Sequence, residues 1–319
     1  MKLKELFPEK WIPTSLDTDD LVGHKVDYLD EGFIQLVDRM GDDMAIADGA
    51  RTSFRSSAEE YSEKRNKGLI RYLIEHRHTS PLELPSLQFR VKIPLFVRAQ
   101  HVRHRTQSCN WESQRYQKPD GSYYVPPVER LRCQDTWNKQ GSGHKLPENA
   151  AQQLRDGYLN RCETSWKEYI RLVEDVGLSR ETARDCLHPN FYSTGIFSMK
   201  LHNMFHYLKL RNDDHAQPEI HLFAHILELF VEELFPMAYE AWVEFDKEAI
   251  TVSKSQYELL KFLINDMSEM CYNYHVNIAQ CIKEDLKHYG SKRRIKDFVQ
   301  KFMPTLLEYE DSREILLGD

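Results

Sequence analysis

The chain has 319 residues, of which 41% are hydrophobic and 29% are charged, as is ordinary for a globular protein with a sizeable core. Its net charge of -7 argues against nucleic acid as the main partner, because nucleic-acid-binding domains are usually strongly basic. No apolar run is long enough for a membrane span or a signal peptide, so neither is expected.

The first predicted elements are a strand, a helix and a second strand. The apolar run 33–37 predicts a buried strand. Apolar residues recur on one face of residues 59–76, which predicts a helix that ends before Pro81, since a residue preceding proline is pushed away from helical angles. Apolar and polar residues alternate over 87–93 with the period of two of a half-buried strand.

The middle of the chain predicts two helices, a strand and a loop. Pro94 suits the first turn of a helix, and this helix leads into the basic residues 103–105, where arginines would meet the negative end of the helix dipole. Residues 122–126 predict a strand, and the polar stretch 134–145 predicts a surface loop. The apolar stripe over 148–176 predicts a long helix.

The remaining residues predict helices almost throughout. Further helices are expected over residues 179–187, 196–210, 220–234, 255–289 and 291–302. We expect a domain boundary within 242–251. The expected fold class is therefore α+β, with helices packed around a small antiparallel sheet.

The most informative stretch is RHRTQSCNWESQRY, residues 103–116. Arginines this close together repel one another, so we expect an anion such as a diphosphate or a nucleotide monophosphate to offset them. A solvated basic loop is the alternative interpretation.

This stretch resembles the signature of the flavin-dependent thymidylate synthases: RHR, two residues, Ser, any, Asn, Glu, any, Ser, any, Arg, Tyr. Eight of the nine fixed positions match, and Trp111 stands where the family has Glu. LRNDDHAQPEIHLFA, from Leu210 onward, resembles the family's second block, LR, three residues, HAQ, any, Glu. HRHTSPLEL and ETARDCLHPN resemble further blocks, all in the family's order.

The resemblance implies an enzyme that converts dUMP to dTMP. It implies FAD as the source of the hydride, 5,10-methylenetetrahydrofolate as the carbon donor and NADPH as the reductant of the flavin. It also implies a homotetramer whose active sites join several subunits. The catalytic domain would be 28–246, preceded by an extension over 1–27 and followed by a helical extension over 247–319.

The resemblance further implies which residues form the site. Flavin-side positions are Ser53, His78, Ser80, Glu83, Arg103, His104, Arg105, Thr106, Trp111, His202, His206 and His215. Nucleotide-side positions are Gln100, Arg103, Glu112, Ser113, Gln114, Arg115, Arg184 and Arg211. Arg211 is the expected catalytic residue, because the family's arginine at this position binds and polarises the uracil. For Arg184 and Arg211, salt bridges to neighbouring aspartates are the structural alternative.

Trp111 leaves two alternatives open. Either Glu112 takes over the family glutamate's contact through a local backbone shift, or Trp111 stacks on a ligand ring and the substrate differs. The second alternative favours a related flavoenzyme that methylates or hydroxymethylates another pyrimidine nucleotide. A nucleic-acid-binding protein is the less favoured rival from another class.

The six cysteines show neither CxxC pairing nor zinc spacing, so we expect no metal site and reduced thiols in a cytoplasmic protein. Cys109 is not expected to be a nucleophile, because no His or Asn/Asp pattern activates it.

Overall fold

The computed structural model describes residues 3–16, 20–136 and 139–258, together with the single residues 260, 299 and 315. The chain divides into two compact units, residues 1–249 and residues 250–319. The predicted helix over 291–302 and most of the one over 255–289 lie outside the described residues. The division into a catalytic domain and two extensions stays a prediction.

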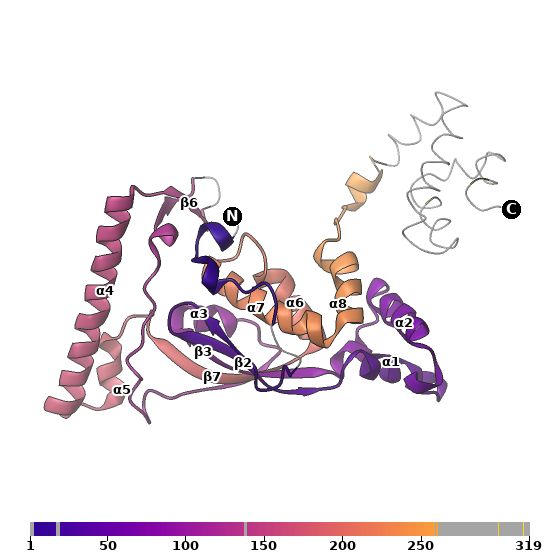
Figure 1. Ribbon diagram of the computed structural model, residues 1–319, viewed down its shortest axis with the longest axis horizontal. Helices are drawn as coiled ribbons and strands as arrows, with labels where there is room; N and C mark the ends of the chain where they lie inside the picture. The colour runs from indigo at the N-terminus through magenta and orange to yellow at the C-terminus, as the bar shows by residue number, and fades with distance from the viewer. Residues whose placement is uncertain are drawn as a thin grey trace. The chain divides into compact units, whose positions relative to one another are not determined.

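Five strands form one antiparallel sheet in the order β1-β2-β3-β7-β4, and Figure 1 labels its three central strands β2, β3 and β7. They are β1 (Lys25–Tyr28), β2 (Gly32–Met40), β3 (Ser86–Pro94), β4 (Ser108–Trp111) and β7 (Tyr192–Lys200). β3 lies at the centre and pairs along its whole length with β7. The predicted strands 33–37 and 87–93 are confirmed, and both are longer than predicted because pairing with their neighbours continues beyond the apolar core.

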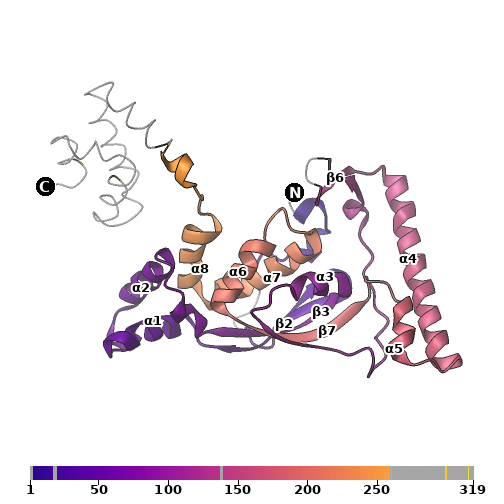
Figure 2. The same cartoon turned by 180° about the vertical axis from the view of Figure 1, so that it is seen from behind.

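Three helices cover one face of this sheet, as Figures 1 and 2 show from opposite sides: α3 (Leu95–His101), α6 (Leu201–Arg211) and α7 (Pro218–Leu234). α7 is buried along most of its length, because a broad apolar face that includes Phe223, Leu227 and Phe230 packs into the core. Its Phe230 ring lies 5.4 Å from Phe89 of β3, which stacks 5.5 Å from Phe197 of β7. This helix-on-sheet core confirms the α+β class.

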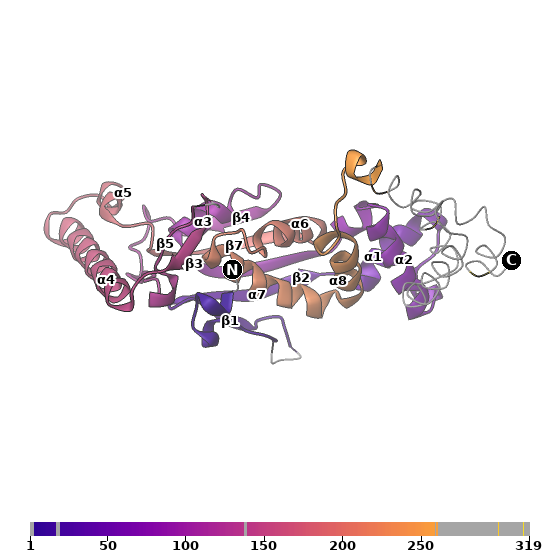
Figure 3. The ribbon, with the colours of Figure 1, turned by 90° about the horizontal axis from the view of Figure 1, so that it is seen from above.

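The other helices lie beyond the two ends of the strands (Figure 3). α1 (Asp43–Arg51), α2 (Glu63–Glu75) and α8 (Pro236–Trp242) pack together at one end, and α4 (Glu148–Ile170) and α5 (Arg180–Ala183) lie at the other. α1 begins where the Asp42 carboxylate accepts hydrogen bonds from the backbone N–H groups of Met44 and Ala45, at 2.9 and 3.2 Å.

Short elements complete the described part. The 3₁₀ turns are Leu3–Glu5, Glu9–Trp11, Thr52–Phe54, Ala58–Glu60, Ser80–Glu83, Val128–Arg130 and Arg184–Cys186. Two π-helical turns, Arg171–Asp175 and Val243–Lys247, extend α4 and α8. The predicted long helix over 148–176 and the helix over 220–234 are confirmed.

Three sequence predictions are wrong in part. Residues 196–200 belong to β7 and not to a helix. The spacing of their apolar residues fits both a helix and a strand, and hydrogen bonding to β3 makes them a strand. The stretch 134–145 is not simply a loop, since β5 (Arg132–Gln134) and β6 (Ser142–Lys145) form a small antiparallel hairpin. Residues 122–126 form no strand, and only Tyr123 bridges to another residue, Phe191.

The four cysteines in the described part, Cys109, Cys133, Cys162 and Cys186, are free thiols. The cytoplasmic location expected from the cysteines stays a prediction. Among the described residues, no helix combines the length and the apolar character needed to cross a membrane.

Candidate active site

His104 and Arg211 meet where the turn after α3 reaches the last residue of α6. Arg211 donates from Nε to Nε2 of His104 across 2.8 Å. Burial, followed by the charges of Arg211 and His206, lowers the pKa of His104 to about 4, so its ring is neutral near pH 7 and can accept this bond. The Tyr207 ring lies 4.4 Å from His104 and packs edge-on against it.

The expected alternative for Arg211, a salt bridge to a nearby aspartate, does not occur among the described residues. Asp213 instead accepts hydrogen bonds from the backbone N–H and from Nδ1 of His215, both at 2.8 Å. The guanidinium of Arg211 is therefore oriented by a neutral partner and keeps its charge uncompensated there. Such a cation can stabilise negative charge that develops on a ligand.

A cavity of about 580 Å³ opens beside the basic motif. It brings together three of the predicted flavin-side residues, Glu83, Arg105 and Thr106, and its wall continues over Lys200. Asn203 of α6 fixes the loop by donating to the backbone oxygen of Thr106 at 3.0 Å. The guanidinium groups of Arg103 and Arg105 are exposed and make no hydrogen bond or ion pair with any described residue, so both can receive an anion.

The other predicted flavin-side residues do not line this cavity. Ser53 and Ser80 are exposed near the ends of α1 and α2, and the exposed His78 lies with its ring 5.8 Å from that of Tyr72. His202 and His206 line a separate cavity of about 160 Å³. His215 lines a third cavity, of about 590 Å³.

Three of the nucleotide-side residues, Ser113, Arg115 and Arg184, lie on or near α5 and the loop that contacts it. Arg115 forms an ion pair with Glu181 at 3.2 Å, and Arg180 donates to the backbone oxygen of Tyr116. Ser113 Oγ accepts from the backbone N–H of Arg115 at 3.3 Å. Arg184 is half-buried, and its guanidinium has no hydrogen bond or ion pair within the described part of the chain. This end of the molecule thus offers a hydroxyl and a free guanidinium to an anion.

Trp111 is half-buried, and its ring packs on neighbouring protein groups. Its ring covers Gly195, its cross-strand partner on β7. The guanidinium of Arg98 lies over the same ring, 4.8 Å from its centroid, and the edge-on ring of His101 lies at 6.0 Å. The indole Nε1 is buried without a hydrogen bond among the described residues.

Glu112 leaves β4 beside Trp111, with its backbone N–H donating to the Thr194 oxygen at 2.9 Å. Burial raises the pKa of the Glu112 carboxyl, and the Thr194 backbone hydrogen bond, followed by the charges of Arg98 and Lys92, opposes that rise. The backbone N–H of Thr194 faces this carboxyl and stabilises its charged form.

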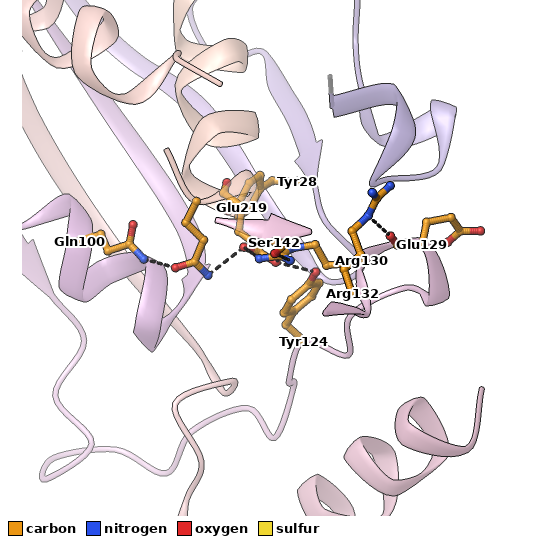
Figure 4. Close-up of polar contacts among 9 residues, drawn as sticks. Tyr28, Gln100, Tyr124, Glu129, Arg130, Arg132, Ser142 and Glu219 are labelled. Carbon is orange, nitrogen blue, oxygen red and sulfur yellow. Dashed lines mark hydrogen bonds and ion pairs between the residues drawn. The ribbon is translucent and has the colours of Figure 1, made fainter. Parts of the chain in front are cut away.

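Gln100 belongs to a polar chain that the sequence did not reveal (Figure 4). Its amide donates to Gln217, which donates to Glu219 at 2.8 Å, and Glu219 pairs with Arg130 at 2.9 Å. Gln217 and Glu219 stand in the HAQ block and so carried a signal, whereas Arg130 and Arg98 carried none.

The chain is similar in sequence to known proteins over about three quarters of its length. A family model described as thymidylate synthase complementing protein matches residues 35–237. Flavin-dependent thymidylate synthases from Wolbachia pipientis wMel and Ehrlichia ruminantium (strain Gardel) are 39% and 37% identical to it over 241 residues. These alignments cover 76% of this chain and 83% and 80% of the two relatives.

Solved structures of a UMP/dUMP methylase, PolB from Streptomyces cacaoi, are similar in fold. The structure bound with 5-Br dUMP has a TM-score of 0.63 at 32% identity and covers 70% of this chain and 99% of that one. The structure bound with 5-Br UMP has a TM-score of 0.61 at 32% identity and covers 68% of this chain and 96% of that one.

Proposed function

The chain belongs to the flavin-dependent thymidylate synthase family, and on that premise we propose that it methylates dUMP to dTMP. In this reaction 5,10-methylenetetrahydrofolate is the carbon donor, FAD is the bound flavin and NADPH is its reductant. The observation that carries the proposal is the Arg211–His104 pair. It joins the two family motifs, because the guanidinium of Arg211 from the second block donates to His104 of the RHR block and has no anionic partner there.

The chemistry requires negative charge on a uracil ring whose C5 is a poor nucleophile. Arg211 would bind the ring and stabilise that charge, since a guanidinium stays protonated and acts strongly in a site from which water is excluded. Ser113, Arg115 and Arg184 would hold the nucleotide phosphate, with Gln100, Gln114 and Glu112 as further nucleotide contacts. Because the guanidinium of Arg184 makes no hydrogen bond or ion pair with any described residue, it is available for a bidentate contact with a phosphate.

The donor set beside β4 fits a flavin dinucleotide. Arg103 and Arg105 have no anionic partner among the described residues, and a diphosphate would supply one. When bound, FAD supplies hydride chemistry that amino-acid side chains cannot perform. The remaining family positions, Ser53, His78, Ser80, His202, His206 and His215, are proposed as flavin contacts as well.

We further propose a homotetramer. The predicted site residues lie in separate groups on one chain: Ser53 and His78 follow α1 and α2, whereas Arg115 and Arg184 lie near α5, at the opposite end of the strands (Figure 3). Sites shared between copies would bring such groups together. Sedimentation equilibrium tests this proposal, and a monomer at micromolar concentration would contradict it.

Incubation of the purified protein with dUMP, methylenetetrahydrofolate and NADPH, followed by mass spectrometry of the nucleotide, tests the function. We expect dTMP, and we expect flavin absorbance near one equivalent per chain after reconstitution with FAD. Failure to bind FAD at micromolar concentration, or absence of any methylated nucleotide, would contradict the proposal.

A second substrate, UMP, has one specific observation in its favour. The similar PolB structures are of a protein described as a UMP/dUMP methylase. Parallel assays with dUMP, UMP and dCMP distinguish a strict thymidylate synthase from an enzyme that also methylates another pyrimidine nucleotide.

A further inference from the structure

Glu219 lies in the first turn of α7 with only 2% of its surface exposed. Its Oε1 accepts from Arg130 Nε at 2.9 Å and from the Tyr124 hydroxyl at 3.2 Å (Figure 4). Its Oε2 accepts from Gln217 Nε2 at 2.8 Å. A carboxylate held by a guanidinium in this way can only accept hydrogen bonds.

This acceptor determines the orientation of the two amides that follow it. Gln217 must turn its NH₂ group toward Glu219, so its carbonyl oxygen faces the other way. Gln100 must then donate from its own NH₂ group to that oxygen. Since an amide has one donor end and one acceptor end, the end of Gln100 that remains is its carbonyl oxygen, which accepts no hydrogen bond from any described residue.

We infer that Glu219, acting through Gln217, is a positioning residue that makes Gln100 present a hydrogen-bond acceptor to the nucleotide. This inference rests on the proposed function, in which Gln100 is a nucleotide contact. The group recognised must be a donor, and dUMP offers two: the uracil N3–H and the 3′-hydroxyl. Cytosine carries a lone pair at N3, so a fixed acceptor there would oppose it.

The hydrogen bonds from Gln100 to Gln217 and from Gln217 to Glu219 form a relay, and two variants interrupt it at different points. Glu219→Gln keeps the shape but offers either end of an amide, so Gln217 and Gln100 can reverse. Gln217→Met disconnects Gln100 while leaving the Glu219–Arg130 ion pair and the Tyr124 bond in place. Tyr124→Phe is the matched control, because it removes a hydrogen bond to Glu219 without changing the direction of any amide.

The measurement is equilibrium binding of nucleotides to the FAD-loaded protein, with retention of FAD and the thermal midpoint recorded for each variant. We expect the dissociation constant of dUMP to rise about tenfold in Gln217→Met and Glu219→Gln, the size of one lost hydrogen bond to a fixed group. Tyr124→Phe should bind dUMP as the wild type does.

Two nucleotide analogues identify the donor that is recognised. If it is N3–H, the preference for dUMP over dCMP shrinks about tenfold in both relay variants. If it is the 3′-hydroxyl, the wild type should bind 2′,3′-dideoxyuridine monophosphate about tenfold more weakly than dUMP. The relay variants should then bind the two nucleotides with equal affinity. If Gln217 and Glu219 had only a structural role, the variants would lower the thermal midpoint. They would change neither the affinity ratio of dUMP to dCMP nor that of dUMP to the dideoxy analogue.

The inference would be overturned if Gln217→Met retains FAD, binds dUMP with wild-type affinity and keeps both affinity ratios of the wild type. In that case the proposed function would still stand as long as the wild-type protein turns over dUMP. A wild-type protein that binds no dUMP would overturn both.

Discussion

Gly195→Ala should destabilise the sheet, because Trp111 occupies the space that a side chain at residue 195 would need. An added Cβ would lie 2.5 Å from Cδ2 and 2.8 Å from Cζ3 of the indole, and closer still to Cε3. Favourable carbon–carbon contacts lie at about 3.5–4.0 Å, so the ring would have to move by roughly 1 Å. Arg98 lies over the same ring, so the displacement would disturb that contact as well.

Overpacking of this kind typically costs about 1–3 kcal/mol. For a folded unit of this size each kcal/mol lowers the midpoint by about 2–4 °C, so we expect a fall of about 2–12 °C by calorimetry. The backbone of Gly195 has no positive φ, so an alanine is opposed only by the contact with the indole.

A double-mutant cycle isolates that contact. In the Trp111→Leu background, Gly195→Ala should cost less than about 0.5 kcal/mol, because the smaller side chain leaves room for the new methyl group. If Gly195→Ala lowers the midpoint equally in both backgrounds, Trp111 does not pack on Gly195 and the reasoning fails.

Arg211→Ala should lower kcat about 10²–10³-fold while FAD absorbance is retained, and wild-type kinetics would remove Arg211 from the site. His104→Gln keeps an acceptor near the position of Nε2 and should preserve more kcat/KM than His104→Asn, whose acceptor lies nearer the position of Nδ1; equal values would show that Arg211 does not need this acceptor. Burial is the main cause that lowers the pKa of His104 to about 4 and of His101 to about 3, so the unfolded chain binds more protons than the folded one. The stability that is present above pH 6.5 should therefore decline as the pH falls toward 4. Urea midpoints measured over this range should decline less for His104→Gln than for the wild type. Cys109→Ala should keep most turnover, because the exposed thiol makes no hydrogen bond to a His, Asp or Glu base among the described residues; complete loss in a folded, FAD-loaded variant would indicate a covalent cysteine mechanism.

The sequence predicted those elements of the fold whose pattern fits only one period. Strand 87–93 alternates without exception and α7 carries an apolar stripe at helical spacing, so both were found. Residues 196–200 combine Ile, Phe and Met in a spacing that suits a helix or a strand, and only their pairing with β3 decides the outcome. The β5–β6 hairpin is polar on both strands, so it carries no periodic apolar signal.

For the site, the motifs predicted residue types but not contacts. They identified His104 and Arg211 separately, and only the fold brings the end of α6 against the turn after α3. Trp111 was open to two interpretations because a single strand does not reveal that its cross-strand partner is a glycine. Arg130 stands in no motif, and its role appears only where it meets the buried Glu219.

The pairing of β3 with β7 has a consequence for the order of events on the ribosome. β3 ends at Pro94, but its partner begins at Tyr192, about a hundred residues later. At roughly 5–20 residues per second, about 5–20 s pass before that partner is made. During this interval one edge of β3 stays unpaired in the nascent chain and can join other chains. Slow codons within the α4 segment would lengthen this exposure, so the yield of soluble protein should depend on translation speed there and on chaperones that cover the edge.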